Sequence, residues 1–169
     1  YMGNTGGSTG PHLHFEIREE TSEHVVNPAL FGFKVHDTKA PAIRALKIIP
    51  LDKNTLINGK NKPLKINVKQ INNSFEAALH EKLIISGRVA LGINVYDYNN
   101  TSHLKNGIYK LSLYVDSLLY FQYLMDKFSF DQTRYINDLI DYKTYKTNKE
   151  RFIMSSVSPG NKLNIYKVL

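Results

Sequence analysis

Two histidines stand two residues apart near the start of the chain, at positions 12 and 14. An imidazole nitrogen binds zinc well, at about 2.0–2.1 Å. Imidazole is also the commonest general base near neutral pH. His12 and His14 are therefore candidates for metal binding or for proton transfer. Such a pair is also common on the surface of strands, so the pair alone leaves a functional and a surface role open.

The residues around this pair alternate between apolar and polar side chains. The apolar set is Leu13, Phe15 and Ile17, and the polar set is His12, His14, Glu16 and Arg18. This alternation predicts a half-buried strand over 12–18. Residues i and i+2 of a strand share a face and lie about 6.6 Å apart, so both histidines would reach the same cavity. The polar stretch 19–24 predicts a turn. Pro28 should end the unit, because proline cannot donate to a ladder.

Four of the ten glycines lie in the first ten residues, which predicts a loop with unusual backbone angles. A phosphate-binding loop is not expected there, because the segment leads into a strand and lacks the Gly-Lys-Ser/Thr ending. The chain has no cysteine, which excludes disulfides, thiolate zinc sites and cysteine nucleophiles.

The segment 3–16, GNTGGSTGPHLHFE, resembles the C-terminal signature of the lysostaphin-type (LytM-like) zinc metallopeptidases in residue types, order and spacing. Asn27-Pro28 is similar to the point where that family's chain leaves the catalytic sheet. The resemblance covers about residues 1–33. It implies a zinc-dependent endopeptidase that is secreted or held in the cell envelope or periplasm. Many members of the family cut the peptide cross-links of peptidoglycan.

The resemblance also implies roles for both histidines. His14 corresponds to a zinc ligand, and His12 to a catalytic group that orients or deprotonates the attacking water. The family's two other ligands form an H-x3-D motif, and no histidine of this chain is followed by aspartate at that spacing. We therefore expect the chain to begin late in a metallopeptidase domain and to be inactive alone. Glu16, on the same face, is expected to form a salt bridge to a neighbouring strand.

An alternative reading comes from another functional class. Some relatives have lost zinc ligands and act as binding or activating modules for other cell-wall hydrolases. The H-x-H motif retains both histidines here, which favours the enzyme over the activator. An upstream H-x3-D motif would support the enzyme, and its absence would support the activator.

The composition is typical of a globular domain, with 42% hydrophobic and 22% charged residues in 169. No apolar run approaches the ~20 residues of a transmembrane helix.

The formal charge of +7 divides into −2 for residues 1–36 and +9 for the rest. A basic surface could meet nucleic acid, anionic lipid or an acidic wall polymer. Because the lysines are dispersed, we expect mostly solvated charges and no nucleic-acid partner.

The polar segment 36–41 ends in proline and predicts a boundary near residue 37. We therefore expect the end of a metallopeptidase domain at 1–36 and an accessory domain at 37–169. Alternating runs predict strands over 42–49, 64–69, 89–96, 109–116, 118–128 and 163–168, with turns at 58–59, 106–107 and 116–117. Helical spacing predicts one short helix at 132–142, with Asp131 as its cap.

These elements predict a mainly β fold: a terminal hairpin followed by an immunoglobulin-like β-sandwich with one short helix. The segments 126–131, 134–137 and 159–163 also resemble the β-rich C-terminal region of metallopeptidases from Bacteroidetes-like bacteria.

The apolar face formed by Leu13, Phe15 and Ile17 should be exposed. Residues 1–33 should be less ordered than the sandwich unless they dock on it.

Overall fold

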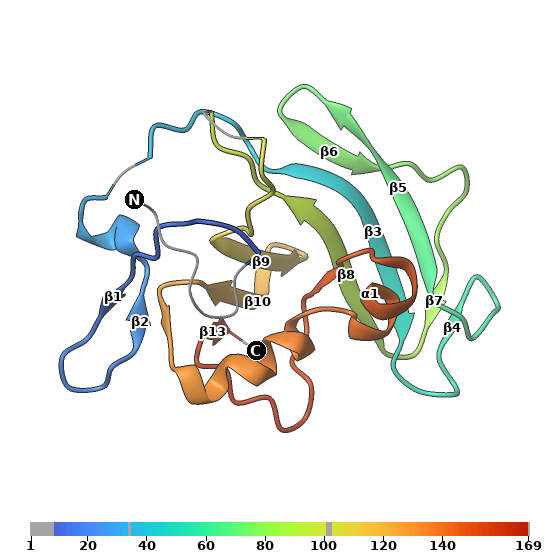
Figure 1. Ribbon diagram of the computed structural model, residues 1–169. Coiled ribbons are helices and arrows are strands. Elements are labelled where there is room, and N and C mark those ends of the chain that lie inside the picture. The colour runs from blue at the N-terminus through green and yellow to red at the C-terminus, as the bar shows by residue number, and fades with distance from the viewer. Residues whose placement is uncertain (1–8, 34, 101–102, 169) are drawn as a thin grey trace.

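The computed structural model describes residues 9–33, 35–100 and 103–168. A five-stranded sheet in the order β12-β8-β3-β5-β6 faces a three-stranded sheet in the order β13-β10-β9 (Figure 1). Helical segments cover one end of the two sheets, and the N-terminal hairpin lies to one side. The predicted fold class, mainly β with a short helical part, is confirmed. No helix in the described ranges is long and apolar enough to cross a membrane.

The five-stranded sheet is antiparallel and centres on a long strand, β3. Its strands are β3 (Ala42–Pro50), β5 (Leu64–Ile71), β6 (Ser74–Ala77), β8 (Val89–Tyr96) and β12 (Ile153–Met154). Leu46 of β3 lies opposite Ile66 on one side and Ile93 on the other. The strands predicted at 42–49, 64–69 and 89–96 are therefore confirmed.

The second sheet contains β9 (Lys110–Val115), β10 (Leu118–Leu124) and β13 (Tyr166–Val168). Asp116 and Ser117 join β9 to β10 with φ angles of 48° and 67°, as a tight hairpin turn requires. The strand predicted over 118–128 is divided. β10 ends at Leu124, and β11 (Lys127–Phe128) pairs with the N-terminal hairpin instead.

Of the turns predicted at 58–59 and 106–107, the structure contains only the first. Asn58 and Gly59 have φ angles of 48° and 75° and form a turn beside the small sheet of β4 (Leu56–Ile57) and β7 (Ile85–Ser86). Asn106-Gly107 is not a tight turn, because Asn106 exchanges backbone hydrogen bonds of 3.1 and 2.8 Å with Asp97. This pairing holds the segment extended.

The core lies between the two sheets and beneath the helical segments. Its buried members, which come from both sheets and from the chain around them, are Val95, Ile108, Phe121, Tyr123, Leu139, Ile153, Leu163 and Ile165. Burial of one large apolar side chain contributes about 1.5–3 kcal/mol. A smaller cluster of Ile48, Ile57 and Ile66 lies on the same face of the five-stranded sheet, toward its other end.

The predicted helix at 132–142 corresponds to two helices. A 3₁₀-helix, η2, spans Phe130–Leu139, and an α-helix, α1, spans Tyr142–Asn148. Ser129 is the N-cap residue of η2, and the predicted cap, Asp131, lies in its first turn. The two helices are separated because Ile140 is extended and pairs with Ile153. A helix cannot continue through a residue that joins a β-bridge.

The N-terminal hairpin consists of β1 (Ile17–Arg18) and β2 (Val25–Val26), followed by the 3₁₀-helix η1 (Pro28–Phe31). The strand predicted over 12–18 is thus confirmed only at its last two residues. β2 provides partners for Ile17 and Arg18 alone, so the residues before them have no ladder to join. β2 also pairs with β11, which docks the hairpin on the rest of the chain.

Candidate functional site

The candidate site lies in the extended segment that leads into β1. His12 is exposed, and its Nδ1 lies 3.0 Å from the carbonyl oxygen of Gly10. A carbonyl only accepts, so Nδ1 carries the proton and donates in this contact. In the neutral ring the lone pair is then on Nε2, the atom that could accept a proton or bind a metal. The glycine-rich part at residues 3–8 lies outside the described residues.

His14 is on the same segment and is also exposed. Its side chain is 73% accessible, and its Nε2 lies 3.5 Å from Oε2 of Glu16. Glu16 Oε1 accepts a hydrogen bond of 2.8 Å from Nε of Arg18. The residues at positions 14, 16 and 18 therefore share one face, as predicted. The partners of Glu16 lie on its own segment, so the expected salt bridge to a neighbouring strand is wrong.

The charge of Glu16 is fixed by these neighbours. The hydrogen bond from Arg18 is the main reason that the pKa of Glu16 lies below its usual range, and His14 lowers it further. Glu16 is therefore a carboxylate at neutral pH and offers an anionic partner to the His14 ring.

Within the described contacts of this segment, the two imidazoles lie against different partners. His12 contacts Gly10, whereas His14 lies against Glu16. No group of three or more His, Asp or Glu side chains in the described ranges is placed to hold a metal ion. Catalytic zinc needs three protein ligands. The described residues alone therefore do not form a complete zinc site.

The apolar face beside the histidines is exposed, as predicted for two of its three residues. The exposed fractions of Leu13 and Phe15 are 82% and 56%, whereas Ile17 is half-buried. The Phe15 ring contacts Phe33, with ring centroids 5.1 Å apart. β1 is an edge strand of its sheet within the described chain. An open edge next to an apolar face can accept further strands.

A second polar cluster joins the hairpin to β11, and sequence reasoning missed it. Glu19 Oε1 accepts a hydrogen bond of 2.6 Å from Nζ of Lys127, and Glu19 Oε2 accepts one of 2.6 Å from Ser22. The Lys127 hydrogen bond is the largest cause of the lowered pKa of Glu19. Arg18 also lies over the Phe130 ring, 4.7 Å from its centroid. No local pattern signals contacts across more than a hundred residues.

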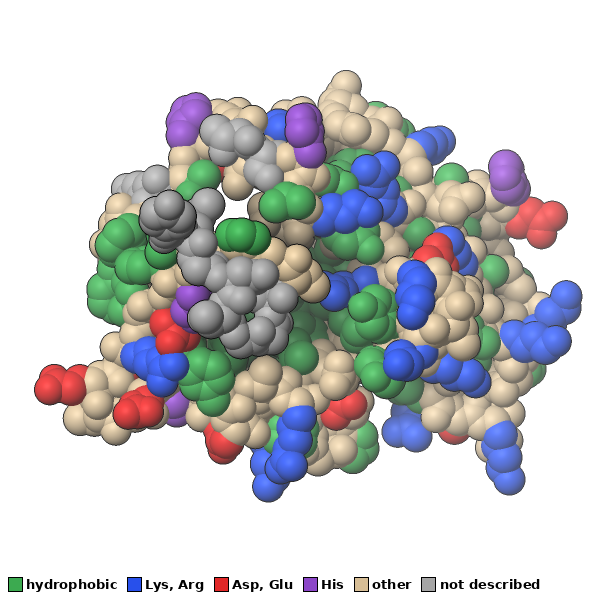
Figure 2. Space-filling model, viewed as in Figure 1, with side chains coloured by type: hydrophobic (Ala, Val, Ile, Leu, Met, Phe, Trp, Pro, Cys, Tyr) green, Lys and Arg blue, Asp and Glu red, His purple; other side chains and the backbone are tan. Residues whose placement is uncertain are grey.

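The surface charge is distributed as the sequence predicts, with an acidic N-terminal part and a basic remainder. Acidic side chains gather on the hairpin, whereas lysines and arginines cover the face over α1 and the five-stranded sheet (Figure 2). The other predicted surface histidines, His36, His80 and His103, are exposed. His24 is half-buried, with its Nδ1 3.9 Å from Glu19 Oε2.

Comparison with known proteins gives no relative from which a function could be transferred. No protein-family model, curated protein or solved structure matches this chain.

Proposed function

We propose that the chain is part of a zinc-dependent metalloendopeptidase that hydrolyses peptide bonds in peptidoglycan cross-links. His14 provides one zinc ligand, and His12 acts as a catalytic group. The observation that carries this proposal is the motif at 3–16, whose second histidine is exposed beside the carboxylate of Glu16. The cell envelope, the periplasm or the extracellular space is the corresponding location.

The remaining zinc ligands would come from an H-x3-D motif, which this chain does not contain. Zinc with three protein ligands keeps an open position for water and lowers the pKa of that water to about 7. The contribution of this chain is then to place the His14 ring at the metal and to hold it there. Glu16 supports this role, because a carboxylate near an imidazole fixes the orientation of the ring.

The hairpin offers a surface for the rest of such a domain. β1 has an open edge in the described chain, and Leu13, Phe15 and Phe33 present apolar side chains next to His14. Burial of this surface by neighbouring strands would order the segment 9–16, which is irregular here. The docked β2–β11 pair would then link the catalytic sheet to the sandwich.

The test uses the full-length product of the gene that encodes this chain, loaded with zinc and assayed on purified peptidoglycan. His14→Ala should abolish turnover and weaken zinc binding. His12→Ala should keep zinc but lose about 10²–10⁴-fold in turnover, as expected for a general acid–base group. His80→Ala, which alters an exposed histidine of the sandwich, is the control. Unchanged turnover in the His14 variant would refute the assignment.

The incomplete set of ligands among the described residues favours a second candidate, a non-catalytic module that binds or activates cell-wall hydrolases. This module would bind peptidoglycan without turnover, and His14→Ala would leave its binding unchanged. Stimulation of a separate wall hydrolase by the purified chain is the positive result that distinguishes it from the enzyme.

A further inference from the structure

A cavity of about 330 Å³ lies under the helical segments, far along the chain from the histidines. It is bounded by η2, α1, β10 and β12. Its wall is mainly apolar, with Ile108, Tyr123, Leu139 and Ile153. The volume is within the range of small-molecule sites, and the lining combines apolar side chains with a few polar groups, as such sites do.

A cationic group is part of this wall. Arg151 and Tyr145 both line the cavity, and the Arg151 guanidinium carbon lies 5.6 Å from the centroid of the Tyr145 ring. Nζ of Lys149 lies 5.9 Å from the same centroid. Two cations thus converge on one ring at the cavity.

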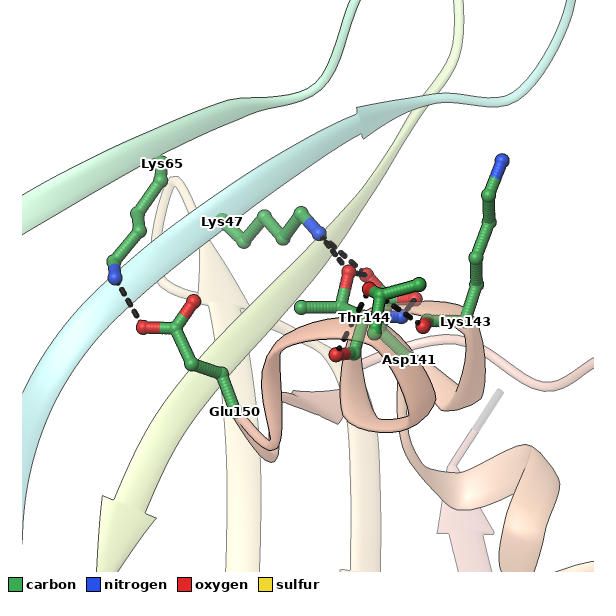
Figure 3. A network of polar contacts seen from close by, with 7 residues as sticks. Lys47, Lys65, Asp141, Lys143, Thr144 and Glu150 are labelled. Carbon is green, nitrogen blue, oxygen red and sulfur yellow. Dashed lines mark hydrogen bonds and ion pairs between the residues drawn. The ribbon is translucent and has the colours of Figure 1, made fainter.

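Two acids of this region have other partners. Asp141 pairs with Lys47 at 2.6 Å, and Glu150 pairs with Lys65 (Figure 3). Within the part of the chain that the structure describes, Arg151 has no salt bridge to an acid. A guanidinium with no acidic partner next to an apolar cavity is suited to receive an anion.

We propose that this cavity binds a small carboxylate with an apolar body. The apolar part packs among Ile108, Tyr123 and Leu139, and the carboxylate accepts hydrogen bonds from Arg151. The planar guanidinium matches a carboxylate through two parallel N–H donors, which gives such pairs both strength and orientation. The site is independent of the proposed peptidase activity.

The segment that closes the cavity is suited to ligand entry. Ile136, on η2, lines the cavity and has an exposed fraction of 40%. η2 is a 3₁₀-helix of ten residues, and 3₁₀ runs of more than three or four residues are uncommon because their hydrogen-bond geometry is poor. Rearrangement of η2 around Ile136 would widen the opening of the cavity.

A second cavity provides an internal comparison. It has a volume of about 530 Å³, lies between the two sheets, and is lined by residues such as Val89, Leu113 and Phe121. Its lining contains apolar, tyrosine and serine residues and no charged side chain. It would take up apolar molecules with no preference for anions, so a preference for carboxylate over alcohol identifies the site at Arg151.

The experiment measures binding of decanoate and of decan-1-ol by calorimetry. The native chain should bind decanoate more tightly than decan-1-ol. Arg151→Met, which keeps an apolar stem, should weaken decanoate binding about ten- to a hundredfold and leave decan-1-ol unchanged. Lys143→Met is the matched control, because Lys143 points away from the contacts around Asp141 and does not line the cavity.

A cavity-filling variant tests the location separately. Gly107 lines the cavity, and a Cβ placed on it meets no atom within 4 Å, so Gly107→Leu should place an apolar side chain at the cavity wall. This variant should unfold like the native chain and lose binding of decanoate. Equal binding of acid and alcohol, or unchanged decanoate binding in both the Arg151 and the Gly107 variants, would overturn the proposal.

Discussion

Nζ of Lys47 donates a hydrogen bond of 2.6 Å to Oδ2 of Asp141, which joins the middle strand of the five-stranded sheet to the first residue before α1 (Figure 3). The exposed fractions of the two side chains are only 13% and 12%. Asp141 also caps α1, because its Oδ1 accepts a hydrogen bond of 3.1 Å from the backbone N–H of Thr144. One carboxylate therefore fixes the helix end and its place on the sheet.

Asp141→Ala should lower the free energy of unfolding by about 3 kcal/mol. The substitution removes an N-cap, and it leaves the nearly buried Lys47 ammonium without its partner. Urea unfolding followed by circular dichroism measures the loss. Glu150→Gln is the control, because Lys65 and Glu150 are more exposed, with side-chain fractions of 45% and 32%. That loss should stay below about 1 kcal/mol, and equal losses would contradict the special role of Asp141.

The pair of Lys47 and Asp141 should make the free energy of unfolding depend on pH in the acidic range. Burial favours the neutral form of Asp141, but the hydrogen bonds from Lys47 and Thr144 outweigh it, so the pKa of Asp141 is lowered. A lowered folded-state pKa contributes stability above the unfolded value of about 3.9, and this contribution is lost as the pH falls through the folded value. Between pH 5 and 3, as rough limits, the native chain should lose more stability than Asp141→Asn. Parallel pH curves for the two proteins would contradict this account.

Elements with a local signature could be predicted from the sequence. β5 and β8 alternate cleanly, and the Asp116-Ser117 pair lies between two alternating runs, where a hairpin turn was predicted. β6 (Ser74–Ala77) was missed, because Glu and Ala have low strand propensity and four residues show little periodicity. The break between η2 and α1 was not predicted, since it depends on the bridge between Ile140 and Ile153, which local spacing does not reveal.

For the candidate site, too, the local arrangement could be predicted and the long-range contacts could not. Alternation correctly placed His14, Glu16 and Arg18 on one face, which follows from backbone geometry alone. The salt bridge expected from Glu16 to a neighbouring strand did not form, because Arg18 of the same segment was closer. Docking of the hairpin on β11 depends on contacts with Lys127 and Met125, and a single sequence gives no sign of such distant partners.

Asn27→Ala should loosen this docking. Asn27 Oδ1 accepts a hydrogen bond of 3.0 Å from the Ala29 N–H, and its Nδ2 donates one of 3.3 Å to the Met125 carbonyl. Loss of an N-cap costs about 1 kcal/mol, so the amides of Val25 and Val26 should exchange hydrogen several-fold faster. Hydrogen exchange measured by NMR reports this. Glu20→Ala, in the exposed turn, is the control, and unchanged exchange in the Asn27 variant would show that the other contacts hold the hairpin without the Asn27 side chain.

Gly87→Ala should be more harmful than the same change at another glycine with positive φ. The φ angle of Gly87 is +96°, and an added Cβ would lie 2.7 Å from Oγ1 and 2.9 Å from Cα of Thr55. Thr55 is fully buried, and its hydroxyl accepts a hydrogen bond of 3.1 Å from the Arg88 N–H, so it has no room to move away. Backbone strain and overpacking should together cost about 2–4 kcal/mol.

Gly59→Ala is the matched comparison. Its φ angle is +75°, but an added Cβ meets nothing within 4 Å, so this variant has the backbone strain without the clash. It should lose only about 1–2 kcal/mol. Urea unfolding of both variants gives the difference, which measures the close packing of Gly87 on Thr55. Equal losses would mean that Thr55 shifts to accept the methyl group, so the contact between the two segments would be loose rather than fixed.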